Sequence, residues 1–290
     1  MLPAVVPDLP SSYAACLSLA RSHYENFPVA SFLIPRDLKG PVAAVYAFAR
    51  AADDFADEPG LREPERLERL ADWRRRLAEA GRGRHENHPV FWAISDILTR
   101  FDLPPEPFER LLSAFEQDVT VRRRPAFADV LDYCRRSANP VGELVLRLFR
   151  AWTPERGVRS DAVCTALQLA NFWQDVTVDA RKDRIYAPLE DLRMMGVSEG
   201  EYFEGPLTEA HRELISFEVD RTWRLFREGR PLADEAPGVL RYWLRAVWLG
   251  GTRILEKIEA RRWDVWSARP SLSAWDGPAL LARLIFWRKS

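Results

Sequence analysis

Cysteine, glycine and net charge are all scarce in this chain of 290 residues. The 3 cysteines, Cys16, Cys134 and Cys164, are widely separated, and they match neither a disulfide framework nor a zinc site. The 42 basic residues nearly balance the 43 acidic ones, which leaves a formal charge of −1. This balance excludes the global positive field of a nucleic-acid binder, so no nucleic-acid partner is expected.

Long hydrophobic runs and targeting signals are also missing. The longest uncharged stretch in the central region, Ala162–Gln174, is too short for a membrane span of about 20 residues. Residues 1–7 have no basic segment of the kind that opens a secretory signal, and Asp8 and Pro10 interrupt any apolar run. No Gly-x-Gly-x-x-Gly or Walker lysine occurs, so no nicotinamide cofactor is expected. We expect a cytoplasmic protein, with peripheral contact to the inner face of the membrane as an option.

The chain is predicted to be a single all-α domain covering residues 1–290. Alternating β-branched runs are absent, and apolar residues recur at spacings of three and four, which is typical of helices. Prolines separate these segments. The expected helices are 11–23, 40–58, 63–80, 89–100, 107–118, 126–135, 140–151, 158–179, 207–228, 235–263 and 276–287.

The segment 40–58 predicts a buried helix with a narrow polar stripe. Most of its positions are apolar. The polar exceptions share a face about 60° wide: Tyr46, Arg50, Asp53 and Asp57. Because buried charges are costly unless they are paired or bind a metal, the stripe indicates a polar cavity inside the protein.

The segment 158–179 repeats this arrangement. Its polar positions share a face about 80° wide: Gln168, Asn171, Asp175 and Asp179. Each of the two segments therefore carries a pair of aspartates four residues apart, which places neighbouring carboxylates on one helix face. Such carboxylates repel one another, so a positive group is expected to hold them.

Oxygen ligands alone favour a hard cation, Mg²⁺ or Mn²⁺, over zinc or copper. Two aspartate pairs that face one another would suit magnesium ions bridging a diphosphate, and Gln168 and Asn171 would add amide ligands. The following loop supplies Arg181, Lys182 and Arg184 for phosphate oxygens. Either pair alone would equally suit a solvated face or an ion-pair network. A di-iron bundle is disfavoured because the chain has no Glu-x-x-His.

At these residues the chain resembles the squalene/phytoene synthase family. One acidic signature is AFARAADDFADE, which contains Arg50 through Asp57. The other is QLANFWQDVTVDARKDRIYAP, residues 168–188. YCRRSANPVG at 133–142 and Ser31-Phe32 also resemble family segments and follow the expected order.

This resemblance implies an isoprenoid synthase fold, a single helical bundle around a central cavity. It also implies an enzyme acting on an isoprenoid diphosphate, with magnesium held by Asp53, Asp57, Asp175 and Asp179. Metal and arginine would neutralise the departing diphosphate, while an apolar, aromatic pocket shields a carbocation. The resemblance implies substrate-binding roles for Ser31, Arg50, Tyr133, Gln168, Asn171, Arg184 and Tyr186. The residue pattern adds Tyr46, Arg181 and Lys182 to this set.

At two places the chain departs from the pattern of its carotenoid-forming relatives. In these places it resembles the branch of the family that makes hydroxysqualene in the bacterial hopanoid pathway. Ser137 and Asn139 stand where carotenoid-forming relatives are apolar, and residues 25–35 lack a His/Ser/Lys-rich step. The branch implies a magnesium-dependent lyase that ionises presqualene diphosphate and captures water, with Ser137 and Asn139 holding that water. A local role remains open for both, since Asn before Pro favours a turn and Ser can cap a helix.

Other readings remain open. One alternative function is head-to-head condensation of two prenyl diphosphates to presqualene diphosphate, squalene or phytoene. The other alternative is a non-catalytic helical scaffold. Residues 241–290 contain six of the 11 tryptophans and end in ALLARLIFWRKS. With Arg283, Arg288 and Lys289, this segment either docks on the core or rests on a bilayer. Neighbouring pathway enzymes are further possible partners.

Overall fold

A computed structural model describes residues 8–22, 33–57, 60–85 and 87–288 of the chain. Helices form almost all the regular structure in these ranges, and the β-type pairing found there is an isolated bridge between Arg123 and Ile185. The described chain divides into two compact units. The first consists of Met1–Thr120 and Pro140–Thr153, and the second of Val121–Asn139 and Pro154–Ser290.

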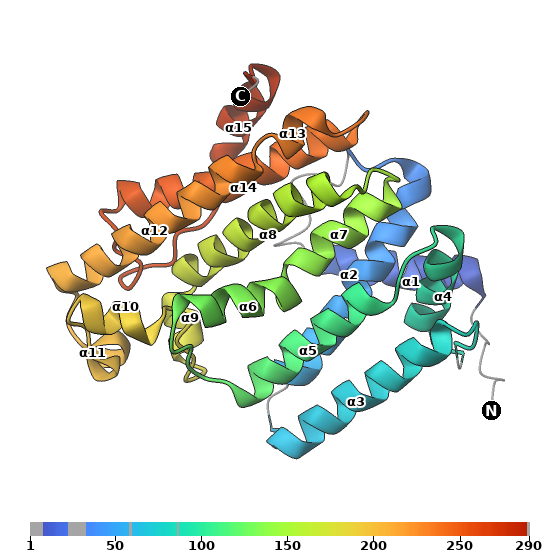
Figure 1. Cartoon of the computed structure of the whole chain (residues 1–290), viewed down its shortest axis with the longest axis horizontal. Helices are drawn as coiled ribbons and strands as arrows, with labels where there is room; N and C mark the ends of the chain where they lie inside the picture. The colour runs from blue at the N-terminus through green and yellow to red at the C-terminus, as the bar shows by residue number, and fades with distance from the viewer. Residues whose placement is uncertain (1–7, 23–32, 58–59, 86, 289–290) are drawn as a thin grey trace. The chain divides into compact units, whose positions relative to one another are not determined.

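The first unit is built around α2, which packs against α1, α3, α4 and α5 (Figure 1). Its helices are α1 (Leu9–Ser22), α2 (Arg36–Asp57), α3 (Glu63–Ala80), α4 (Pro89–Arg100), α5 (Glu106–Thr120) and most of α7 (Asn139–Leu148). Phe48 of α2 is fully buried and meets the rings of Trp73, Phe91 and Phe108 at centroid distances of 6.0, 6.1 and 5.1 Å. The predicted burial of this helix is confirmed.

In the second unit, α8 packs against α12 and α14. Its helices are α6 (Phe127–Ser137), α8 (Pro154–Gln174), α9 (Val176–Ala180), α10 (Leu189–Met194), α11 (Glu199–Glu204), α12 (Glu209–Gly229), α13 (Leu232–Glu235), α14 (Leu240–Ala260) and α15 (Asp276–Ile285). Trp173 of α8 is fully buried, and its indole N–H donates to the Thr222 hydroxyl at 2.8 Å. This bond ties the C-terminal end of α8 to α12.

Two predicted helices are interrupted. The expected helix 158–179 breaks at Asp175, where α8 ends and α9 begins. The residues around the break include Thr and Asp, which have weak helix propensity. The expected helix 235–263 is wrong at its start, because Pro237 and Gly238 separate α13 from α14 and Gly238 has φ of 55°. The short helices α10 and α11 were not predicted.

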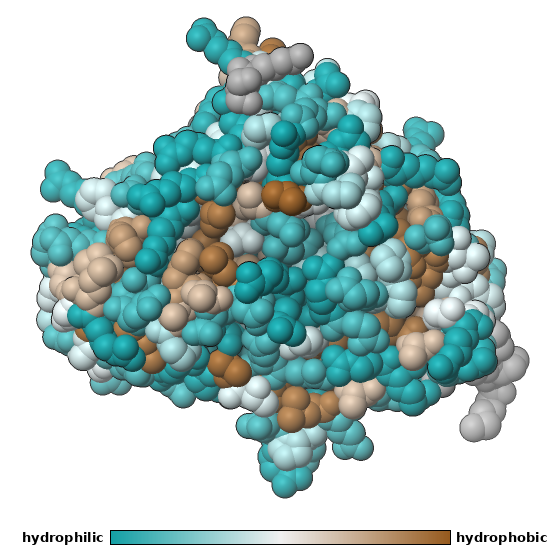
Figure 2. Space-filling view, in the orientation of Figure 1, coloured by the Kyte–Doolittle hydropathy of each residue, from teal (hydrophilic) through white to brown (hydrophobic). Residues whose placement is uncertain are grey.

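The surface agrees with the composition. On the face shown in Figure 2, hydrophobic residues appear as small separate areas among hydrophilic ones. Across the described ranges, every helix is either too short or too polar to cross a lipid bilayer.

The α8–α12 contact depends on a glycine. A Cβ added to Gly229 would lie 2.8 Å from the Arg159 carbonyl oxygen of α8, closer than such contacts allow. Gly229→Ala must therefore push the two helices apart, and we expect it to lower the free energy of unfolding by about 1–3 kcal/mol. Urea denaturation measures this. The control is Gly200→Ala in α11, where an added Cβ meets nothing within 4 Å. Equal midpoints for the two variants would contradict the close-packing explanation.

Candidate functional site

The first acidic motif lies on the least buried face of α2. Tyr46, Arg50, Asp53 and Asp57 are all partly exposed, whereas Ala52 and Ala56 of the same turns are buried. Arg50 forms ion pairs with Asp53 at 3.4 Å and with Asp54 at 2.6 Å. The stripe predicted from the spacing therefore exists, and its arginine pairs with one carboxylate of the stripe, Asp53, and with the adjacent Asp54.

The carboxylates of this motif are crowded. The pKa of Asp53 is raised to about 6, and loss of hydration is the largest cause, although 42% of the side chain is exposed. The carboxylate of Asp57 is the next contribution to this increase, Arg50 opposes it, and Asp118 and Asp54 add smaller contributions. A divalent cation would offset this repulsion, and several carboxylate oxygens are a donor set that suits Mg²⁺. The donor type, carboxylate oxygen, therefore suits such an ion.

Asp118 was missed by the sequence analysis. It is buried on α5, one helical repeat of seven residues after Leu111, so it occupies a core-facing position. A charged residue in phase with the apolar face of a helix is the signal that would have identified it.

The second acidic motif is placed around the break between α8 and α9. Gln168 and Asn171 belong to α8, Asp175 occupies the break and Asp179 belongs to α9, and all four are partly exposed. The Asn171 amide donates to the Asp175 carboxylate at 3.1 Å. The spacing thus brings together an amide and a carboxylate, as expected for a ligand cluster.

Arg269 is a second residue that the sequence analysis missed. Its guanidinium pairs with the Asp175 carboxylate, with Nη2 at 3.3 Å from Oδ2 and Nε also in contact. The neighbouring Pro270 carbonyl accepts a hydrogen bond from the Gln174 amide at 2.6 Å, which fixes this segment beside the motif. No local pattern signals this contact, because the partners are 94 positions apart.

The basic residues of the loop after α9 differ in their exposure to solvent. Arg181 and Lys182 are exposed, whereas Arg184 is buried. The loop is fastened by Arg123, which pairs with Asp183 at 2.7 Å, and by Arg122, which donates to the Lys182 carbonyl at 3.2 Å. Arg181 and Lys182 thus lie on the solvent-facing side of the loop.

Aromatic rings gather next to this loop. Tyr186 stacks on Phe172 at 3.8 Å with an interplanar angle of 7°, and the buried Tyr133 lies 5.8 Å from Tyr186. The Arg124 guanidinium lies 4.5 Å from the centre of the Tyr133 ring. Tyr133 and Tyr186, both predicted site residues, therefore belong to one cluster of π faces that suits a cation.

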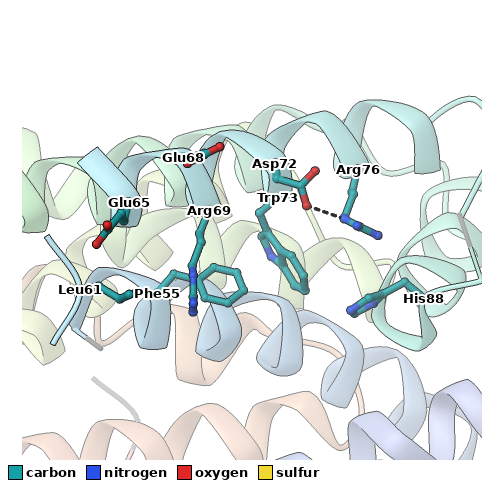
Figure 3. A pocket seen from close by; sticks show the side chains of 9 residues that line it. All are labelled: Phe55, Leu61, Glu65, Glu68, Arg69, Asp72, Trp73, Arg76 and His88. Carbon is teal, nitrogen blue, oxygen red and sulfur yellow. Dashed lines mark hydrogen bonds and ion pairs between the residues drawn. The ribbon is translucent and has the colours of Figure 1, made fainter. Parts of the chain in front are cut away.

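A pocket of about 520 Å³ lies elsewhere in the first unit, between α2 and α3 (Figure 3). Its walls include Phe55, Arg69 and Trp73, and Figure 3 shows Asp72 paired with Arg76 at its rim. Phe55 is on the opposite face of α2 from Asp53, so this pocket contains none of the predicted site residues. His88 lines it as well and packs edge-on against Trp73 at 5.2 Å, as a structural residue.

Comparison with known proteins decides the family. The description "Squalene/phytoene synthase" belongs to the family profile that matches residues 20–276. The chain belongs to the squalene/phytoene synthase family. Its members are enzymes of isoprenoid diphosphates, and the predicted all-α isoprenoid synthase fold is confirmed.

Individual relatives support this membership. The chain is 28% identical to a phytoene synthase of Arthrospira platensis, over 91% of this chain and 89% of that enzyme. It is 38% identical to a hydroxysqualene synthase of Zymomonas mobilis, over 65% of this chain and 63% of that enzyme. The crystal structure of squalene synthase HpnC from Alicyclobacillus acidocaldarius has a TM-score of 0.83 and 39% identity, covering 88% and 95% of the two chains.

Family membership leaves the metal assignment as a prediction. Within the described ranges, no three side chains of His, Cys, Asp or Glu lie close enough together to form a ready metal cluster. Asp53 and Asp57 belong to the first unit, and Asp175 and Asp179 to the second. Ser31, a further predicted site residue, lies outside the described residues.

Ser137 and Asn139 occupy the junction of α6 and α7. The Asn139 side chain is buried, and its Oδ1 accepts a hydrogen bond from the Thr165 hydroxyl at 3.0 Å. The Ser137 hydroxyl is also shielded from solvent, and no residue of the described chain forms a hydrogen bond with it. Because a buried hydroxyl without a partner is costly, a small polar molecule would be stabilised there.

The raised pKa of Asp53 has a consequence for stability. The pKa of this group is about 6 in the folded protein against 3.8 ordinarily, so the folded state binds the proton more tightly than the unfolded chain does. The stabilisation from proton binding is complete below about pH 4 and is lost as the pH rises through 6. In chelating buffer, Asp53→Asn should therefore melt at a higher temperature than the parent at pH 7, and the difference should shrink towards pH 4.

Thermal melts at both pH values test this, with Asp37→Asn as the control. Asp37 is an exposed aspartate in the first turn of the same helix, where a negative charge is favourable. Its replacement should bring no gain. A melting temperature for Asp53→Asn at or below that of the parent at pH 7 would mean that the crowding is not costly.

Proposed function

We propose that this protein converts presqualene diphosphate to hydroxysqualene. The observation that supports the proposal is the shielded hydroxyl of Ser137, which has no hydrogen-bond partner among the described residues and lies one helical turn from Tyr133 on α6. In this proposal the hydroxyl holds the attacking water. The higher identity to the hydroxysqualene synthase of Zymomonas mobilis, 38% against 28% for the phytoene synthase, supports the same choice.

The reaction separates into three events. The carbon–oxygen bond to the diphosphate breaks, the cyclopropylcarbinyl cation rearranges, and water adds to the resulting cation with release of one proton. The products are hydroxysqualene and diphosphate. The protein must therefore neutralise the leaving group, protect the cation from premature capture and position one water.

The acidic motifs would hold the metal for the first event. In this proposal Asp53, Asp57, Asp175 and Asp179 ligate Mg²⁺, or Mn²⁺ in its place. When bound, the ion neutralises the charge that develops on the departing diphosphate. Arg181, Lys182 and Arg184 bind phosphate oxygens, and Gln168 and Asn171 orient the acidic ligands.

Aromatic residues and the polar junction serve the later events. The π faces of Tyr133, Phe172 and Tyr186 stabilise positive charge without offering a nucleophile. Ser137 holds the attacking water, and Asn139, fixed by Thr165, shapes the junction around it. Tyr46, Arg50 and Ser31 complete the predicted substrate-binding set.

Condensation of two prenyl diphosphates is the second candidate. It is favoured by the phytoene synthase of Arthrospira platensis, whose similarity extends over 91% of this chain, whereas the hydroxysqualene synthase aligns with 65%. A non-catalytic scaffold is the weakest candidate, because the crowding around Asp53 costs free energy that a bound cation would offset.

Product identification tests the proposal. The purified chain is incubated with presqualene diphosphate and magnesium, with and without NADPH, and the lipid is analysed by mass spectrometry. We expect hydroxysqualene in both arms. Squalene formed only with NADPH, or turnover of farnesyl or geranylgeranyl diphosphate with none of presqualene diphosphate, would favour the condensing enzymes.

The same assay examines the water-holding residue. Removing the hydroxyl in Ser137→Ala should lower the ratio of alcohol to dehydrated hydrocarbon by about tenfold, the effect of losing one hydrogen bond. Ser160→Ala removes another buried serine hydroxyl, on α8, and should leave the ratio unchanged. The same ratio in both variants would remove Ser137 from the mechanism.

A further inference from the structure

The helix α15 presents its apolar residues to solvent and its charges to the protein. Four large apolar side chains in and beside it are strongly exposed: Trp275 at 91%, Leu281 at 54%, Ile285 at 67% and Phe286 at 78%. Gly277, Pro278, Ala279 and Ala282 complete the same exposed face. An ordinary surface helix has the opposite polarity.

The inward charges of α15 fix this orientation. Asp276 pairs with Arg253 at 2.9 Å and with Lys257 at 2.6 Å, both on α14. Arg283 pairs with Glu256 of α14 at 2.7 Å. Both charged side chains of the helix are therefore engaged on the side that faces α14, next to which α15 lies in Figure 1.

A tryptophan after the helix strengthens this attachment. The Trp287 indole donates to Asp234 at 2.8 Å and meets the Trp248 ring edge-on at 5.4 Å. Turning the apolar face of α15 inward would break these bonds and both ion-pair groups. The exposure of the apolar face is thus imposed by the contacts on the other face.

We propose that the exposed face of α15, formed by Trp275, Leu281, Ile285 and Phe286, is a docking surface for a lipid bilayer. The helix lies in the interface without spanning the membrane, since it has only 10 residues. Trp275 stands at one end of the face, and tryptophan favours the boundary between headgroups and hydrocarbon. Exposed Arg288 stands at the other end, and residues 277–288 contain no acidic side chain to repel anionic headgroups.

The size of the face favours lipid over a second copy of the chain. Its four large side chains expose on the order of 500 Å². A stable dimer buries about 800 Å² on each partner. A bilayer sets no such minimum, because partial immersion of an amphipathic helix is sufficient for reversible binding.

The family match ends at residue 276, where α15 begins. The benefit of docking rests on the proposed function, since presqualene diphosphate and hydroxysqualene both carry long hydrocarbon chains that partition into bilayers. A docked enzyme would exchange them without exposing them to water.

Vesicle flotation of the full-length protein tests this proposal. The probes are phosphatidylcholine vesicles with and without phosphatidylglycerol, in the absence of presqualene diphosphate and magnesium. We expect the parent to float with the vesicles, more strongly with phosphatidylglycerol. The double variant Ile285→Glu/Phe286→Glu should lose roughly tenfold or more in partitioning, since both apolar side chains leave the interface.

Val158→Glu is the matched control. Val158 is 72% exposed on α8, and its replacement should leave partitioning unchanged. All variants change exposed side chains and should keep the parent melting temperature. In addition, brominated lipid should quench tryptophan emission in the parent, and Trp275→Phe should remove most of that quenching.

Each alternative result has a definite meaning. Absence of flotation in the parent, or equal flotation of the double variant, would overturn the proposal. Self-association that the double variant abolishes, without vesicle binding, would assign the face to a second copy and overturn it as well. Because the assay contains no substrate or metal, a failure of the proposed reaction leaves the vesicle result interpretable.

Discussion

Repulsion between carboxylates is the constraint on which the site depends. Asp53 shares its surroundings with Asp54, Asp57 and Asp118, and the positive charge of Arg50 only partly compensates them. Together with the loss of hydration, which is the largest cause, this crowding raises the pKa of Asp53 from 3.8 to about 6. A fold that maintained such crowding without use would lose stability for no gain, whereas a site awaiting a cation gains both affinity and charge selectivity from it.

In the second acidic motif, the negative charge of Asp175 is balanced by groups of the protein itself. Asp175 has Arg269 and Asn171 as partners, so its negative charge is already balanced. Any cation that Asp175 ligates must compete with the Arg269 guanidinium. The segment that carries Arg269 is fixed by the Gln174–Pro270 hydrogen bond. The two motifs therefore have similar sequences and different electrostatic surroundings.

The sequence patterns predicted those features that depend on residues close together in the chain. The apolar composition of 40–58 predicted a buried helix with a polar stripe, and both are present because one helix period determines them. The break at Asp175 and the partners Asp118 and Arg269 depend on contacts between distant segments, which spacing does not encode. The sequence also left open whether the end of the chain docks on the core. It does so through Asp276, Arg283 and Trp287, while the apolar residues of α15 face outward.

The central proposal is that the aspartates of each acidic motif are ligands for divalent ions. Titration of Mn²⁺ in the presence of inorganic pyrophosphate, followed by electron paramagnetic resonance, measures ion binding in the parent, Asp53→Asn, Asp175→Asn and the double variant. The account predicts that each single replacement weakens Mn²⁺ binding and that the double variant binds most weakly, because each replacement removes a charged oxygen ligand. Unchanged binding in either single variant would contradict it.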